Sequence, residues 1–285
     1  MSNGKQRYKC AACGKRFIGG ERLNNQVLWQ EYVVGKQTYI QLATKHACCS
    51  RTVQRRLDNV GTRVVSSSPK EVIVLMDTTY FGRKFGVMLF KDALSGVNLY
   101  KTYVRTETNQ QYAQGIEYLL QKGFTVNAIV CDGRRGLFQL FPGIPIQMCN
   151  FHQVAIIRRY LTQKPKMQAS KELWALTLML VRTDKESFEG ALSDWNIKWE
   201  SFLNERRKDD KGKLRYVHKS LRSACRSLKT NLPWLFTWYD SIETGIPNTT
   251  NAIDGHFADL KNKLRNHNGL STQRRKKFID EFLKV

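Results

Sequence analysis

Residues 71–77, Glu-Val-Ile-Val-Leu-Met-Asp, form a nearly continuous apolar run that ends in an acid. Such a run without polar alternation is typical of a strand buried on both faces. Residues 128–133, Ala-Ile-Val-Cys-Asp-Gly, repeat the pattern. Acidic side chains are rarely buried unless they are paired or bind a metal. Two strands that end in Asp77 and Asp132 therefore predict neighbouring strand ends that direct two carboxylates to one point.

The segments around these two runs predict a mixed α/β core. We expect further strands at 85–90, 98–104 and 146–149, a helix capped by Thr108 or Asn109 and ended by Gly123, a short helix at 137–141, and a helix from about Phe151. Residues 155–245 are expected to be a mostly helical insertion whose tryptophans belong to the core. Residues 247–285 are expected to hold an amphipathic helix and a basic tail.

If a third carboxylate joins these two, the three can hold two Mg²⁺ ions about 3.5–4 Å apart. This arrangement assists in-line displacement at phosphorus. Magnesium takes few carboxylates and leaves coordination positions open for phosphate and water. The alternative is structural: Asp132-Gly133 is a turn that follows a strand, and Asp77 caps a turn or helix. Both acids together, in this strand order, favour metal binding, with Mg²⁺ or Mn²⁺ as the expected cofactor.

The charge of the chain points to a polyanionic partner. Its 285 residues include 47 Lys and Arg against 24 Asp and Glu, a formal net charge of +23. Each phosphate contact releases condensed counterions, so the excess of positive charge favours a polyanionic partner such as double-stranded DNA. The chain has no apolar run long enough for a membrane span and no signal-peptide core. Seven cysteines, an odd number, indicate a reduced intracellular protein. We therefore expect a cytoplasmic, nucleoid-associated protein without a membrane partner.

The N-terminal residues 1–23 have the form of a partial zinc ribbon. Cys10-Ala11-Ala12-Cys13-Gly14-Lys15 resembles one zinc knuckle, but a structural zinc needs four ligands. Cys10 and Cys13 supply two, and His46, Cys48 and Cys49 have no standard ligand spacing. Either Zn²⁺ binds here or the segment is a degraded or truncated ribbon with two free thiols.

Residues 24–66 predict a helix-turn-helix. Short helical segments surround Val27, Thr38–Ala43 and Ser50–Leu57, and Ser50 is expected to cap the last of them. Arg51, Gln54 and Arg55 would then point outward near the helix start, where a recognition helix contacts the major groove. The alternative is a small helical bundle with a solvated basic face. A linker, Val65–Lys70, follows.

Four motifs in order resemble the Mutator-like superfamily of transposases. They are Leu75–Phe81 around Asp77, Cys131-Asp132-Gly133, Cys149-Asn150-Phe151-His152, and Pro247–Phe257. The chain looks like a bacterial insertion-sequence branch with an N-terminal zinc ribbon and helix-turn-helix, and the likeness runs from about residue 4 to the C-terminus.

This resemblance implies a ribonuclease-H-like mixed sheet at 70–154, interrupted by the helical insertion at 155–245 and completed by the last helix within 246–285. It implies a DDE triad for DNA cleavage and strand transfer, with Asp77, Asp132 and Asp254 as catalytic and metal-binding residues. Asp254 departs from the pattern, because the family has Glu there. Its carboxylate is one methylene shorter, and a displacement of about 1 Å can cost about 10²-fold in rate.

Other residues of the last two motifs have supporting roles. Cys149 and His152 form the family's Cys-x-x-His pattern, but two ligands do not make a zinc site. His152 is expected to orient DNA or a core polar group. Ile253, Phe257, Leu260 and Leu264 predict a buried stripe, with Lys261 and Arg265 free to contact DNA phosphates.

Three functions remain open at this point. The first is an active transposase that assembles as a homo-oligomer, since two element ends must be joined in one complex. The second is an inactive, truncated or domesticated DNA-binding derivative, which the incomplete zinc ribbon and Asp254 favour. The third is a ribonuclease-H-fold nuclease of the resolvase type, against which the long insertion and the N-terminal region argue.

Overall fold

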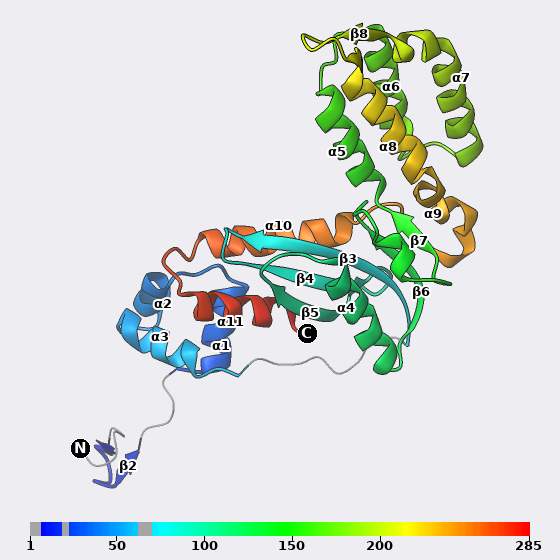
Figure 1. Ribbon diagram of the computed structural model, residues 1–285. Helices are drawn as coiled ribbons and strands as arrows, with labels where there is room; N and C mark the ends of the chain where they lie inside the picture. The colour runs from blue at the N-terminus through cyan, green and yellow to red at the C-terminus, as the bar shows by residue number, and fades with distance from the viewer. Residues whose placement is uncertain (1–6, 19–22, 62–69) are drawn as a thin grey trace. The chain divides into compact units, whose positions relative to one another are not determined.

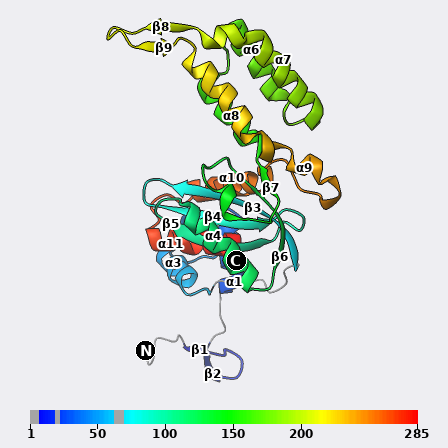
Figure 2. The same ribbon diagram turned by 45° about the vertical axis from the view of Figure 1, so that its right-hand side comes forward.

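The computed structural model describes residues 7–18, 23–61 and 70–285, with backbone alone at 17 and 18. Figures 1 and 2 show the arrangement of its elements. The chain divides into two compact units. One unit combines the residues up to Val65 with Ala258–Lys284, and the other comprises Ser66–Phe257 with Val285. Of the predicted linker Val65–Lys70, residues 65–69 lie outside the described residues.

The larger unit is built on a five-stranded mixed sheet, which confirms the predicted α/β class. Its strands are β3 (Glu71–Phe81), β4 (Phe85–Asp92), β5 (Asn98–Val104), β6 (Thr125–Cys131) and β7 (Ile146–Met148). Their order is β5-β4-β3-β6-β7. The three strands β3, β4 and β5 pair antiparallel, whereas β6 is parallel to both β3 and β7. Strand β4 is buried along its whole length and β3 is buried from Val72 to Met76, as their apolar sequences predict.

The strand β3 is longer than its apolar run predicts. It continues through Asp77 to Phe81, because residues 78–81 pair with 85–88 of β4 across a turn at Gly82. Gly82 has a φ of +66°, which glycine adopts at little cost. The prediction that Asp77 ends its strand is therefore wrong: Asp77 lies inside β3, at the point where pairing with β6 has stopped.

Helix α4 (Asn109–Gln121) follows β5 and packs on β5 and β6. Thr108 caps it, one of the two residues predicted to do so, and forms a capping box with Gln111; the turn at Gly123 follows the helix with a φ of +83°. Its inner face carries Ile116 and other buried residues of the core. After β6 come a single 3-10 turn, η1 (Phe138–Leu140), and the last strand, β7.

The contact between α4 and the sheet is tightest at Gly115. A Cβ placed there would lie 2.0 Å from Cζ of Phe90, which is fully buried. We expect Gly115→Ala to lower the free energy of unfolding by about 2–3 kcal/mol through overpacking, measured by urea unfolding. Gly190→Ala is the matched control, because nothing lies within 4 Å of that Cβ on an exposed helix face. It should stabilise by about 0.5–1 kcal/mol, and equal effects of the two variants would contradict the close packing.

Residues 150–245 are mostly helical, with one exception. The elements are α5 (Asn150–Leu161), α6 (Gln168–Met179), α7 (Lys185–Asn204), β8 (Arg206–Lys208), β9 (Leu214–Tyr216), α8 (Lys219–Leu235), α9 (Thr237–Asp240) and η2 (Ile242–Thr244). Trp195 is buried, and Trp174, Trp199 and Trp234 pack partly buried against the same core, as predicted, whereas Trp238 is half-buried and is not part of that core. The antiparallel pair β8–β9 was not predicted.

The smaller unit contains a short hairpin and helices. Its elements are β1 (Arg7–Lys9), β2 (Arg16–Ile18), α1 (Asn25–Val33), α2 (Tyr39–Lys45), α3 (Ser50–Asp58), the end of α10 (Asn251–Arg265) and α11 (Thr272–Leu283). Two predictions are wrong here. Ser50 is the first residue of α3, and Cys49 occupies the cap position without a side-chain capping bond to the backbone of the helix. The basic tail is not a tail but the helix α11, because Phe278 and Ile279 are fully buried and Phe278 packs against Tyr32.

Within the described ranges, no helix combines the length and the apolar character that crossing a membrane requires.

Candidate functional site

Asp77 and Asp132 lie level with each other on neighbouring strands. The last parallel pair of β3 and β6 is Leu75 opposite Val130, and each acid follows its member of this pair by two positions. Side chains two apart along an extended chain share a face. The register therefore brings the two carboxylates together, and their charges interact. The sequence predicted this proximity correctly, although it placed Asp77 at a strand end.

Asp254 reaches the same place from α10. Two buried residues of that helix, Ile253 and Phe257, fix the orientation of its first turns. The hydroxyl of Thr250 donates to Oδ2 of Asp254 over 3.0 Å, and the backbone N–H of Asp254 donates to the Thr250 carbonyl over 3.1 Å. Asp254 interacts electrostatically with Asp77. The charges of both other predicted acids, Asp132 and Asp254, thus act on Asp77.

Cys149 and His152 adjoin these acids at the junction of β7 and α5. The backbone N–H and the hydroxyl of Thr250 both lie 3.3 Å from Sγ of Cys149, which is fully buried. The Asn150 N–H donates to the carbonyl of Asn248 over 2.9 Å. These bonds fasten the segment before α10 to the start of α5. Cys149 and Thr250 therefore hold Asp254 in position, a structural role for which the sequence gave no signal beyond the motifs themselves.

The electrostatics of the site oppose ionisation of Asp77. Burial raises the pKa of the Asp77 carboxyl to about 7, and the negative charges of Asp254 and Asp132 act in the same direction. A hydrogen bond from the Thr78 backbone and the charge of His152 act against the increase. The site therefore accumulates more negative charge than its burial tolerates, and a nearby cation would relieve it.

His152 supplies one positive charge. Its hydrogen bond with the Cys149 thiol raises the pKa of His152 to about 9 against the effect of burial, and the charges of Asp77 and Asp254 add to the increase. Burial would raise the pKa of Cys149, but the hydrogen bonds with His152 and Thr250 outweigh it and lower that pKa. Nδ1 of His152 is buried and has no hydrogen-bond partner among the described residues. His152 thus partly neutralises the carboxylates.

Asp77 should make the metal-free chain less stable as the pH rises. Its pKa is raised from 3.8 in the unfolded chain to about 7, so the neutral form favours folding and its contribution is lost as the pH rises from about 4 to 7. We expect Asp77→Asn to raise the free energy of unfolding at pH 8 by up to about 4 kcal/mol, at 1.36 kcal/mol per pKa unit, and by less than half as much at pH 5.

Urea unfolding in the presence of EDTA at both pH values measures this effect. Asp194→Asn is the control, since Asp194 is an exposed acid on α7 and its loss changes the net charge equally. A gain for Asp77→Asn that is the same at pH 5 and pH 8, or no greater than that of the control, would contradict the assignment.

The carboxylates of Asp77, Asp132 and Asp254 are suitable ligands for a divalent cation, but they do not lie close enough together to bind one. Carboxylate oxygens are the ligands that Mg²⁺ and Mn²⁺ prefer, and the repulsion at Asp77 is the kind that such an ion removes. In the part of the chain that the structure describes, no group of three or more His, Cys, Asp or Glu side chains is close enough to hold a metal ion. Binding would therefore require Asp77, Asp132 and Asp254 to move closer together.

The pair Cys10 and Cys13 flanks a tight turn. The Cys10 N–H donates to the Lys15 carbonyl and the Gly14 N–H donates to the Cys10 carbonyl, both over 2.9 Å. Hydrogen bonds from the backbone of Cys13 and Ala12 lower the pKa of the Cys10 thiol. Two ligands are in place, and no third joins them within residues 7–18, 23–61 and 70–285. Zinc binding stays a prediction.

The predicted DNA-binding residues of α3 lie on one surface. Arg51 and Arg55 are exposed and Gln54 is half-buried, while Val53 and Leu57 are buried as expected. Arg51, Gln54 and Arg55 line a cavity of about 430 Å³, and Arg274 of α11 lines it too. Arg274 forms an ion pair with Asp58 at 2.8 Å.

The predicted phosphate contacts of α10 differ in exposure. Arg265 is exposed and Lys261 is half-buried. In the predicted stripe Leu260 is buried but Leu264 is only half-buried. His267 is buried against Tyr32, where burial lowers its pKa, so it is a core residue.

A hydrogen-bonded chain beside the carboxylates escaped the sequence analysis. The hydroxyls of Thr78 and Tyr112 lie 2.9 Å apart, and the Tyr112 hydroxyl donates to Glu107 over 2.8 Å. Arg134 donates to the carbonyl of Glu107 over 2.8 Å and to Asn109 over 2.6 Å. Thr78 adjoins Asp77, and Arg134 lies two residues beyond Asp132. These hydrogen bonds therefore connect the segment that carries Asp77 with the segment that carries Asp132. Glu107 and Asn109 lie on either side of the Thr108 cap of α4, and polar residues at a helix start are the sequence signal that could have indicated these hydrogen bonds.

Comparisons with known proteins add little. No protein-family model and no curated protein matches the chain. Among solved structures it is similar to a chain of the simian T-cell lymphotropic virus intasome in complex with the PP2A regulatory subunit B56 gamma, with 12% identity over 70% of this chain and 68% of that chain and a TM-score of 0.23. It is also similar to the large terminase nuclease from thermophilic phage G20c, with 11% identity over 61% of this chain and 95% of that chain and a TM-score of 0.22. Such TM-scores are too low to assign a fold or an activity.

Proposed function

We propose that this chain is a DDE-type DNA transposase of the Mutator-like kind, with a ribonuclease-H-like core. The observation that carries the proposal is that the charges of Asp132, just after β6, and of Asp254, on α10, both act on Asp77 of β3. These are the three positions that the sequence motifs single out. Their convergence from distant parts of a strongly basic chain supports phosphoryl transfer on DNA.

The fold is compatible with this proposal. The five-stranded mixed sheet has three antiparallel strands followed by two parallel ones, with α4 between β5 and β6. A long, mainly helical segment then separates β7 from α10. Both features agree with a ribonuclease-H-like core that an insertion interrupts before its last helix.

The proposed reaction has two displacements at phosphorus. Water first attacks the phosphodiester at an element end, the P–O bond to the 3′ oxygen breaks, and a 3′-hydroxyl is released. That hydroxyl then attacks a phosphodiester of the target, the new P–O bond joins the element to the target, and the displaced target 3′ oxygen leaves. A divalent cation supplies Lewis-acid stabilisation of the phosphate charge. Asp77, Asp132 and Asp254 would hold it.

Other residues of the chain support binding. His152, held by Cys149 and protonated at neutral pH, offsets the charge of the acids so that the phosphate backbone can approach. Arg51, Gln54 and Arg55 of α3 would contact the element ends, and Lys261 and Arg265 would contact phosphates. Joining two ends in one complex requires a homo-oligomer.

The test is cleavage and strand joining with Mg²⁺ or Mn²⁺ on DNA that carries the sequences flanking the gene. Products with free 3′-hydroxyl ends that become joined to target DNA support the proposal. DNA binding without any metal-dependent cleavage would overturn it in favour of an inactive or domesticated DNA-binding derivative. Cleavage without joining would point to a nuclease.

A further inference from the structure

The stretch between α7 and α8 forms a two-stranded antiparallel ribbon that the proposed chemistry does not use. We refer to Arg206–Tyr216 as the basic ribbon. Its strands β8 and β9 pair Arg206 with Tyr216, Arg207 with Arg215, and Lys208 with Leu214. Figure 2 shows the two strands side by side beyond the end of α7. All six of these side chains except that of Tyr216 are exposed.

The turn of the basic ribbon is held by Asp209. Its Oδ1 accepts from the backbone N–H of Lys211 over 3.1 Å and of Lys213 over 2.9 Å. Its Oδ2 accepts from Nε of Arg215 over 2.9 Å. Gly212 has a φ of +72°, which suits the turn. The ribbon is therefore shaped before any partner binds.

The base of the ribbon is anchored to the helices. The Val217 N–H donates to the Glu205 carbonyl over 3.0 Å. His218 pairs with the Glu205 carboxylate at 2.9 Å and stacks on Phe202, with ring centroids 3.7 Å apart. These contacts make the ribbon a rigid extension of α7 and α8.

The ribbon carries more positive charge than its own fold accommodates. It contains six basic residues, Arg206, Arg207, Lys208, Lys211, Lys213 and Arg215, and only two acids, Asp209 and Asp210. Arg207 lies directly opposite Arg215, and like charges in this position are destabilising. Among the described residues no ion pair forms with Arg207 or Lys208. This uncompensated charge indicates a polyanionic partner.

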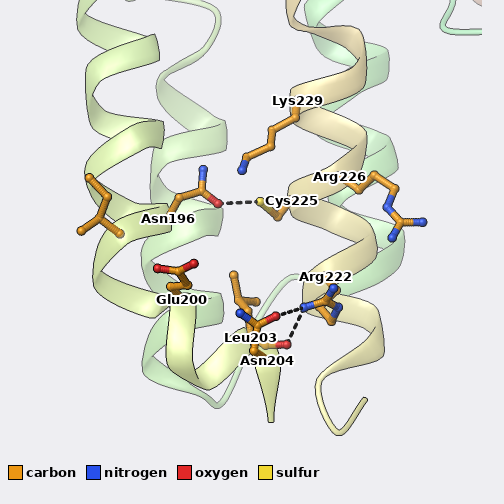
Figure 3. Close-up of a pocket in the computed structure, with 9 residues that line it drawn as sticks. Asn196, Glu200, Leu203, Asn204, Arg222, Cys225, Arg226 and Lys229 are labelled. Carbon is orange, nitrogen blue, oxygen red and sulfur yellow. Dashed lines mark hydrogen bonds between the residues drawn. The ribbon is translucent and has the colours of Figure 1, made fainter. Parts of the chain in front are cut away.

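The positive surface continues from the ribbon onto α8. Arg222 lies 3.6 Å from the centroid of the Tyr216 ring and donates to the Leu203 carbonyl over 2.6 Å. Arg226 and Lys229 follow at four and seven residues, on the same face of the helix. All three basic residues line a cavity of about 420 Å³ between α7 and α8. Figure 3 shows Lys229 reaching toward α7 across this cavity.

We infer that the basic ribbon and the face of α8 with Arg222, Arg226 and Lys229 form a binding surface for duplex DNA. The ribbon enters the major groove, which admits a two-stranded β-ribbon, and the α8 face holds backbone phosphates. The choice of DNA as the polyanion rests on the proposed function. A-form RNA has a major groove too narrow for side chains to read, so it fits the ribbon less well.

Binding of the full-length chain to a fluorescent DNA duplex, in EDTA, tests the surface with two double variants. Arg207→Ala with Lys208→Ala, which leaves the bond from Arg215 to Asp209 in place, should weaken duplex binding about tenfold or more, as expected for the loss of charged contacts to DNA. Arg226→Ala with Lys229→Ala should also make the dependence of log K on log salt less steep by about 1.8, at 0.9 per phosphate contact. Lys122→Ala with Lys171→Ala is the control, because it removes two exposed lysines elsewhere in the same unit.

A photo-crosslinking residue in place of Leu214, which is 57% exposed on β9, locates the contact directly. Crosslinks to duplex DNA, with losses in both variants but not in the control, support the inference. Unchanged binding, losses equal to those of the control, no crosslink, or an equal preference for duplex RNA would overturn it. Since EDTA excludes catalysis, a chain that binds through the ribbon but never cleaves refutes the proposed function alone.

Discussion

Asp132→Ala should abolish metal-dependent cleavage of element-end DNA while leaving DNA binding intact. Asp132 directly follows the parallel strand β6, and its charge acts on Asp77 on the neighbouring strand. Under the proposed function, its loss would remove one ligand and leave the cation held by fewer carboxylates. We expect the cleavage rate to fall by about 10³-fold or more, since each 1.36 kcal/mol of lost transition-state stabilisation costs a factor of ten.

The variant is not expected to unfold. Asp132 is half-buried beyond the end of β6. Its removal takes away one of the negative charges that repel the ionised carboxylate of Asp77. Thermal unfolding and binding in EDTA should therefore match or exceed the wild type. Asp194→Ala, on the exposed face of α7, should cleave normally. Substantial residual cleavage by Asp132→Ala, at the metal concentration used for the wild type, would show that Asp77, Asp132 and Asp254 are not the catalytic centre.

Local sequence signals predicted the parts of the fold that short-range rules govern. The apolar runs in β3 and β6 and the helix cap at Thr108 are of this kind, because burial on both faces and helix capping leave a direct signature. The proximity of Asp77 and Asp132 followed from parallel pairing of the two runs. The extension of β3 to Phe81 did not, since it depends on the turn at Gly82 and on pairing with β4.

Contacts between distant segments were beyond these rules. Nothing in the composition around Asp254 places it beside β3, and only the resemblance of Pro247–Phe257 to a family motif suggested it. The bonds from Thr250 to Cys149 that fasten α10 are visible only in three dimensions. The basic ribbon was overlooked for another reason: Arg206-Arg207-Lys208 has little intrinsic strand preference, and the strands form because Asp209 organises the turn between them.

Asp254 carries the second large expected effect. Its carboxylate is held by Thr250 and feels the charge of Asp77, yet no three acidic or histidine side chains of the described residues are within metal-holding distance. Glutamate adds one methylene, which extends the reach by roughly 1.5 Å. We expect Asp254→Glu to increase the rate of cleavage, by up to about 10²-fold, since catalytic geometry is sensitive to about 1 Å. Asp254→Ala should reduce cleavage to the level of Asp132→Ala.

The three arms of this comparison, measured as initial cleavage rates with Mg²⁺ and with Mn²⁺, separate the explanations. A faster Asp254→Glu enzyme means that the natural chain has a sound scaffold and a third ligand that is too short. A slower one contradicts the argument from reach and means that α10 already positions the shorter side chain correctly. Full activity in Asp254→Ala would remove Asp254 from the site. The bond from the Thr250 backbone N–H to Sγ of Cys149 does not involve the side chain at position 254, so both variants keep this anchor at the start of α10, and their rates report the reach of that side chain together with its bond to the Thr250 hydroxyl.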